Sequence, residues 1–162
     1  AKASEVENAI KHHIKINIED DPEYYKNLSE RLEDIIRKYG DKWEDLVQML
    51  LSFRDNIETD HQQQAVDLGL SPTELAFYNI LISELGGIDA LSDGTESQVK
   101  EVVQSLVQML DEATQIVDFF SKWDEQKRVK KDIKRWVIEN FDESLVGPIT
   151  ERFMDLAETK FK

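Results

Sequence analysis

The sequence contains no cysteine, and this absence excludes several kinds of chemistry. A chain without cysteine has no disulfide, no thiolate nucleophile and no cysteine ligands for a structural zinc ion. Proline and glycine are also scarce, with 3 and 6 residues respectively, and no stretch rich in them divides the 162-residue chain. The length suits one domain, and the lack of cysteine suits a cytoplasmic protein, so we expect a single cytoplasmic domain.

Long hydrophobic runs are missing as well. No apolar stretch approaches the roughly 20 residues that a membrane helix requires, and residues 1–5 are too polar for a signal peptide. We therefore expect no membrane partner. The sequence begins without an initiator methionine and without a clear helix cap, which predicts a fragment of a longer protein.

Positive charge is in the minority. Twenty lysines and arginines face 34 aspartates and glutamates, which gives a formal net charge of −14. A chain with this charge repels the DNA backbone at long range. We therefore expect DNA to be possible only as a secondary partner.

What the sequence has in abundance is a helical pattern. Apolar residues, which make up 40% of the chain, recur at every third or fourth position along most of its length. This spacing places them on one face of an α-helix. Six or seven such segments follow one another without an internal repeat. The pattern predicts an all-α fold class, a single helical bundle-like domain of about six to seven helices over residues 1–162.

Polar signals predict where some helices begin and end. Asp21 followed by Pro22 predicts a helix start, because the aspartate accepts hydrogen bonds from free N–H groups and proline suits the first helical position. Asp41 with Glu44 resembles a capping box and predicts another start. Residues 60–69 are expected to form a connection or a frayed helix end.

The sequence offers no constellation of catalytic residues. None of the glycines lies in a phosphate-binding loop, so the chain alone should not hydrolyse ATP. Glu58 and His61 form a single Glu-x-x-His pair where a di-iron bundle needs two, so we interpret His61 as a surface histidine. Nuclease-like Asp/Glu-x-Lys matches fall on expected helices and are attributed to chance; they are Glu125–Lys127, Asp132–Lys134 and Glu158–Lys160. We predict no catalytic, cofactor-binding or metal-binding residue.

One cluster differs from the acidic background. Six basic residues fall within nine positions, namely Lys127, Arg128, Lys130, Lys131, Lys134 and Arg135. On a helix the four lysines form one ridge, which could contact a phosphate backbone or the acidic surface of a partner. The alternative is a solvated face with local pairs to Asp124, Asp132 and Glu139, each worth only about 0.2–0.5 kcal/mol.

Aromatic residues surround the same segment. Trp123, Trp136 and the Phe119-Phe120 pair could line a groove for a partner. Their helical spacing favours packing in the core instead. Because adjacent residues cannot both face one stripe, we expect one phenylalanine of the pair to be exposed.

Four blocks in this order resemble the C-terminal helical domain of the R (motor/endonuclease) subunit of type I restriction enzymes. Each block alone is weakly specific, and the resemblance depends on their joint order from Ala3 to about Ile138. The blocks are Ala3-Ser4-Glu5 with Ala9-Ile10-Lys11-His12-His13-Ile14; Asp21-Pro22-Glu23-Tyr24-Tyr25 with Leu28-Ser29-Glu30-Arg31-Leu32; Gly69-Leu70-Ser71-Pro72 with Ala76-Phe77-Tyr78 and Leu81; and Trp123 with the basic segment through Ile133-Lys134.

The resemblance implies a role rather than a reaction. R subunits join a nuclease and two ATP-dependent motor domains to this helical region, and they dock on a methyltransferase core of modification and specificity subunits. The nuclease and motor domains would be absent here, so ATP and Mg would be needed only by the parent enzyme. The resemblance implies a non-catalytic assembly domain that packs on the motor domains and contacts the core. The alternative is a free-standing all-α adaptor that binds a protein partner.

Overall fold

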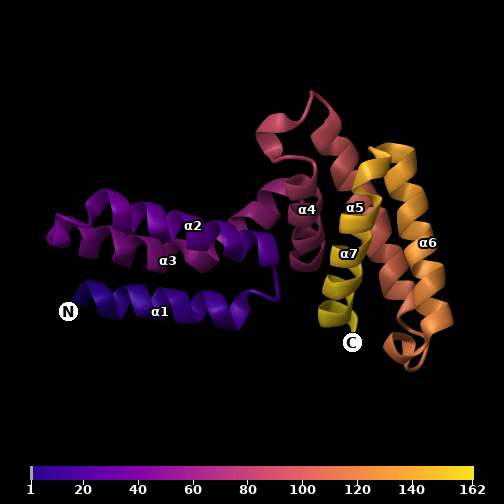
Figure 1. The fold of residues 1–162 in the computed structure, drawn as a ribbon, viewed down its shortest axis with the longest axis horizontal. Coiled ribbons are helices and arrows are strands. Elements are labelled where there is room, and N and C mark those ends of the chain that lie inside the picture. Colours follow the sequence, from indigo (N-terminus) through magenta and orange to yellow (C-terminus); the bar gives the residue numbers. More distant parts are fainter. Residues whose placement is uncertain (1) are drawn as a thin grey trace. The chain divides into compact units, whose positions relative to one another are not determined.

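The structure is a computed structural model that describes residues 2–162 (Figure 1). Within that range all regular structure is helical, which confirms the expected all-α chain of six to seven helices. The α-helices are α1 (Lys2–Asn17), α2 (Pro22–Tyr39), α3 (Trp43–Leu68), α4 (Pro72–Glu84), α5 (Thr95–Ala113), α6 (Trp123–Asn140) and α7 (Val146–Phe161). Short 3-10 helices are η1 (Ile88–Ala90), η2 (Phe119–Ser121) and η3 (Glu143–Leu145).

The helices gather in two compact units, and the boundary between them falls at Pro72. No proline- or glycine-rich linker marks this boundary in the sequence, because it coincides with the first residue of α4. We call residues up to Pro72 unit 1 and residues 73–162 unit 2.

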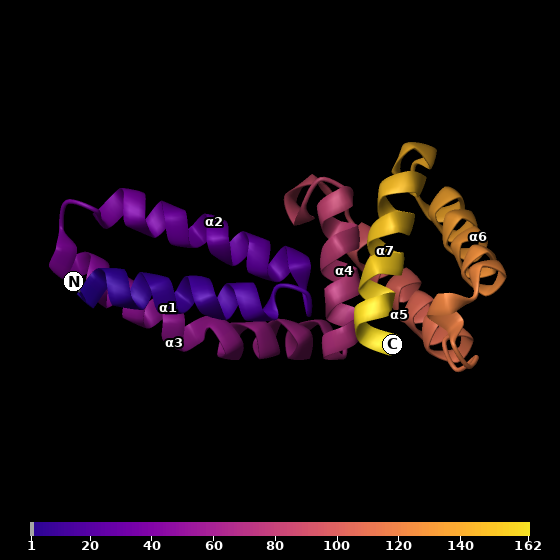
Figure 2. The ribbon, with the colours of Figure 1, turned by 60° about the horizontal axis from the view of Figure 1, so that its bottom comes forward.

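Unit 1 is a bundle of α1, α2 and α3, which lie side by side in two views (Figures 1 and 2). Each helix contributes apolar side chains at helical spacing to one core, and full burial of such a side chain is worth about 1.5–3 kcal/mol. The core residues are Val6, Ile10 and Ile14 of α1, Tyr25, Leu28 and Leu32 of α2, and Leu50, Phe53 and Ile57 of α3.

The predicted start of α2 is confirmed, and so is a helix start after Asp41, but the capping box expected there and the break expected at residues 60–69 are wrong. The Asp21 side chain accepts a hydrogen bond from the backbone N–H of Tyr24. No capping box forms at residues 41–44. Helix α3 begins at Trp43, and its N-cap residue is Lys42, whose side chain makes no capping hydrogen bond. Residues 60–68 continue α3, since glutamine and alanine favour a helix and Ala65 is buried.

Unit 2 contains α4 to α7 and their connecting turns. Six of the thirteen residues of α4 are buried, as expected for a helix with apolar residues around most of its circumference. The ring of Phe77 in α4 meets Phe153 of α7 edge to face, with centroids 5.2 Å apart. An ion pair of 3.0 Å between Arg152 and Glu84 also joins these two helices.

The remaining helices of unit 2 pack along aliphatic stripes. Their buried residues are Val99, Val103, Leu106 and Leu110 in α5, Val129, Ile133 and Val137 in α6, and Ile149, Thr150, Phe153, Met154, Leu156 and Ala157 in α7. In the described chain no helix has the length and apolar character needed to cross a membrane.

Candidate functional site

The packing of α6 fixes which of its side chains face solvent. Val129, Ile133 and Val137, spaced four residues apart, are at most 4% exposed and turn one face of the helix to the core. The six basic residues predicted from the sequence all lie on α6, and all six are exposed. The structure therefore brings the predicted cluster together on one open surface.

The lysines and arginines of α6 differ in their surroundings. Arg128 pairs with Glu125 at 3.6 Å, and Arg135 pairs with Asp132 at 3.3 Å. The four lysines at positions 127, 130, 131 and 134 form no ion pair with any described residue. We call these four lysines the ridge; it extends for about 10 Å along the helix axis. Local pairing thus occupies the arginines and leaves the ridge lysines available to a partner.

One predicted core aromatic lies beside the ridge instead. Trp123 is 67% exposed, and the Lys127 ammonium lies 4.8 Å from its ring centroid, within cation–π range. The core interpretation of Trp123 is therefore wrong. It holds for Phe119, which is buried, while Phe120 is partly exposed, as expected for one of an adjacent pair.

A hollow of about 940 Å³ borders the ridge on the side of α7. Lys130 and Lys134 line it from α6, and Thr150, Glu151 and Asp155 are among the residues that line it from α7. The Thr150 hydroxyl is buried, and no described residue forms a hydrogen bond with it. Because lysines line the hollow from α6 and carboxylates line it from α7, it presents both signs of charge to solvent.

Unit 1 contains a polar cluster that the sequence did not predict. His61 is only 17% exposed at its side chain, and its Nε2 lies 2.7 Å from Oδ2 of Asp21. Its ring stacks on Tyr24 with centroids 3.9 Å apart. The interpretation of His61 as a surface histidine is therefore wrong. Its partners come 37 and 40 positions earlier in the chain, so spacing within α3 held no signal for them.

Glu58 extends this cluster toward α1. One carboxylate oxygen accepts a hydrogen bond from the Tyr25 hydroxyl at 2.9 Å and lies 2.8 Å from Nε2 of His13. Burial alone would raise the pKa of Glu58, but the contacts with His13 and Tyr25 outweigh it and lower the pKa. Burial, followed by the Glu58 hydrogen bond, raises the pKa of Tyr25. These contacts join α1, α2 and α3 and have the character of structural hydrogen bonds.

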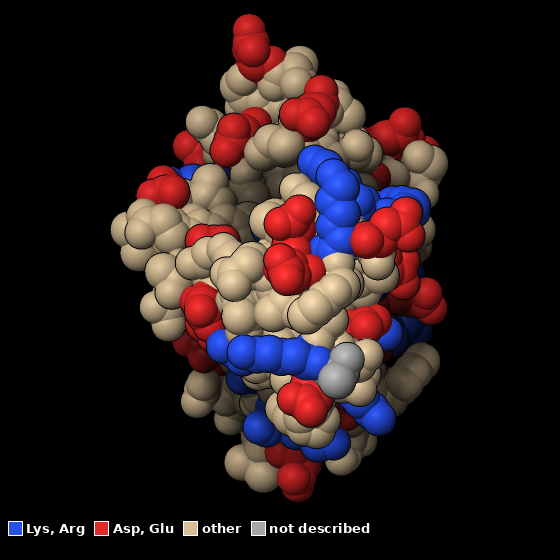
Figure 3. All heavy atoms as spheres, turned by 90° about the vertical axis from the view of Figure 1, so that its left-hand side faces the viewer, with Lys and Arg blue, Asp and Glu red and all other residues tan. Residues whose placement is uncertain are grey.

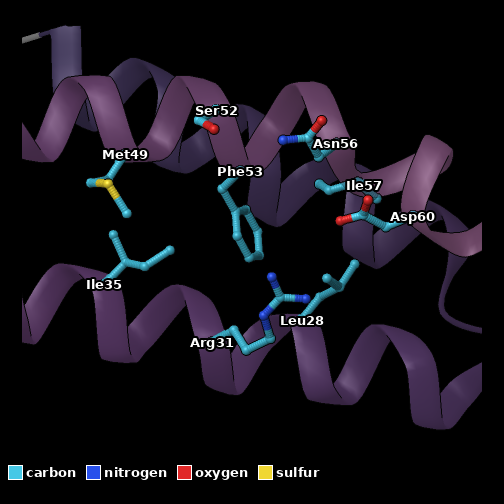
Figure 4. A pocket seen from close by; sticks show the side chains of 9 residues that line it. All are labelled: Leu28, Arg31, Ile35, Met49, Ser52, Phe53, Asn56, Ile57 and Asp60. Carbon is cyan, nitrogen blue, oxygen red and sulfur yellow. The ribbon is translucent and has the colours of Figure 1, made fainter.

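A second hollow, of about 150 Å³, lies between α2 and α3 (Figure 4). The Arg31 guanidinium covers the ring of Phe53 at 5.2 Å from its centroid. Ile35 and Met49 close one end, and Asp60 stands at the other. The hollow is small and shows no convergent set of reactive groups.

On the face seen in Figure 3, acidic and basic side chains are interspersed.

Residues 2–162 contain no group of three or more His, Asp or Glu side chains placed to hold a metal ion. The Glu58 and His61 side chains contact Tyr25, His13 and Asp21 rather than converging on one point. The geometry of unit 1 thus supports stability, and the candidate functional surface is the ridge face of α6.

Comparison with known proteins supplies the context for this surface. Residues 2–159 match the model of a family described as type I restriction enzyme HindI endonuclease subunit-like, C-terminal. A putative type I restriction enzyme MjaIXP endonuclease subunit from Methanocaldococcus jannaschii is 25% identical over 154 residues, which cover 90% of this chain and 14% of the relative. No solved structure matches the chain significantly. The chain belongs to the family of C-terminal regions of type I restriction enzyme endonuclease subunits.

Proposed function

We propose that this chain is a non-catalytic assembly domain of an ATP-dependent, DNA-translocating type I restriction endonuclease subunit. In this role it packs on the motor domains of that subunit and contacts the methyltransferase core formed by the modification and specificity subunits. ATP and Mg act in the motor and nuclease domains of the parent enzyme, in the cytoplasm. The chain spans only 14% of the matched relative, so these activities are assigned to the parent protein.

The observation that carries the proposal is the ridge on α6. Four exposed lysines occupy one face of a helix in a chain whose net charge is −14. Charges of one sign gathered on a surface of opposite overall sign steer a complementary partner and fix its register. Family membership makes the subunits of a restriction enzyme the natural candidates for that partner.

The test is a calorimetric titration of this chain against the purified methyltransferase core, with a DNA duplex as the parallel titrant. Saturable binding to the core and little heat with DNA is the expected result. The triple variant K130E/K131E/K134E should weaken binding to the core, because it places carboxylates against an acidic partner surface. Its control is K11E/K15E/K26E, which makes the same charge change on exposed lysines of unit 1.

The outcomes separate the possible roles. Wild-type chain that does not bind the core would contradict the proposed docking and leave internal support of the motor domains as its role. Equal weakening by the ridge variant and its control would mean that net charge, not the ridge, governs binding. Strong binding to the duplex with none to the core would reassign the ridge to DNA.

A further inference from the structure

The exposed face of α6 carries an apolar residue at each end of the ridge. Trp123 is 67% exposed and Ile138 is 52% exposed. Trp123 precedes Lys127 by four residues, and Ile138 follows Lys134 by four. With 3.6 residues per turn, these four residues lie within about 60° of one another around the helix and span about 22 Å along it.

The centre of this face lies about 110° around α6 from the buried stripe, and neither apolar end is part of the core of unit 2. Val129 and Ile133 supply the core contacts, at 4% and 0% exposure. A single exposed apolar residue on a protein surface is common and needs no explanation. Two of them in line with four unpaired lysines form one continuous face, apolar at both ends and cationic in the middle.

The surroundings of this face suit an acidic protein better than DNA. Glu125 and Asp132 lie on α6 itself, each paired with one of its arginines, and place carboxylates among the basic residues. Glu151 and Asp155 line the hollow beside Lys130 and Lys134 and would repel a nearby phosphate backbone. A protein partner can present bases to these carboxylates and acids to the lysines, whereas a duplex presents phosphates throughout.

We infer that this face of α6 docks an acidic helical segment of a partner protein, which lies along α6 with apolar side chains on Trp123 and Ile138. Carboxylates between those apolar side chains pair with the ridge lysines. About four helical turns of the partner cover the same distance as the face, since each turn rises 5.4 Å and the face extends for about 22 Å. The inference rests on the proposed function, because it places this segment in the methyltransferase core.

The test compares two double variants in the same calorimetric titration. W123A/I138A removes both apolar ends and leaves the ridge intact. Its control is W43A/I16A, which removes the same residue types at 65% and 63% exposure from unit 1. Loss of aromatic and aliphatic anchors at a protein interface costs about tenfold in affinity or more. We expect at least that loss for W123A/I138A and no change for the control, with circular dichroism showing that both variants keep wild-type helicity.

The results distinguish this inference from the proposal on which it depends. If W123A/I138A binds the core as tightly as the wild-type chain does, the inference is overturned and the assembly role stays intact. Loss of affinity for the DNA duplex, rather than for the core, would reassign the face to nucleic acid. Absence of core binding by wild-type chain would remove the proposed function and with it the partner named here.

Discussion

Oδ2 of Asp21 lies 2.7 Å from Nε2 of His61, and the aspartate is only 1% exposed. The same side chain, through Oδ1, caps α2 by accepting a hydrogen bond from the backbone N–H of Tyr24. One residue thus caps the start of α2 and joins this helix to α3. A buried carboxylate that serves two donors is costly to remove, because both donors lose their partner together.

Asp21→Ala should therefore destabilise unit 1. The lost cap costs about 1 kcal/mol, and the lost contact between the carboxylate and His61 adds about 1.5–3 kcal/mol. Urea unfolding followed by circular dichroism measures the change in the free energy of unfolding. Asp20→Ala is the control, since Asp20 is exposed, and it should change stability by less than about 0.5 kcal/mol. Equal effects of the two substitutions would contradict the structural role of Asp21.

Glu58 should make the free energy of unfolding depend on pH in the acidic range. Its folded-state pKa is lowered, since the contacts with His13 and Tyr25 outweigh the effect of burial. A depressed carboxyl pKa adds stability above the unfolded-state value of about 4.3, and this is lost as pH falls through the lower folded-state pKa. Urea midpoints at pH 7 and pH 3 should therefore differ less for Glu58→Gln than for wild type. An undiminished pH dependence in the variant would exclude Glu58 as its source.

The helices and the cap at Asp21 could be predicted from the sequence because both are local. The spacing of Val6, Ile10 and Ile14 defines a helix face, and Asp21 needs only the next three residues to cap α2. The partner of Asp21 could not be predicted, because His61 reaches it only when α2 and α3 pack together. Short-range patterns carry no information about such pairs.

The ridge could also be predicted, but its limits could not. Six clustered basic residues on a helix identify an exposed surface whatever the rest of the fold. The spacing of four that places Trp123 and Ile138 in line with the ridge is present in the sequence. Deciding that Trp123 faces solvent required the position of the buried face of α6, which only the packing of unit 2 supplies. Helical spacing alone assigned it to the core.

Gly69 should not tolerate alanine. Gly69 ends α3 with φ of 67°, a left-handed conformation in which its N–H bonds to the carbonyl of Val66. A side chain there costs about 1–2 kcal/mol, so Gly69→Ala should destabilise the protein. Thermal unfolding of Gly69→Ala measures this loss, and an unchanged or raised melting temperature would contradict it.

Thr150→Val should stabilise the protein. The Thr150 hydroxyl is buried in α7, and no described residue offers it a hydrogen bond. Burying a polar group without a partner costs about 1–3 kcal/mol, and valine keeps the shape of the side chain while replacing the hydroxyl by a methyl group. We expect the free energy of unfolding in urea to rise by about 1 kcal/mol or more. Thr159→Val on the same helix is the control, because Thr159 is exposed and should change stability by less than about 0.5 kcal/mol. A loss of stability on Thr150→Val would instead mean that the hydroxyl binds a water molecule in the hollow beside the ridge.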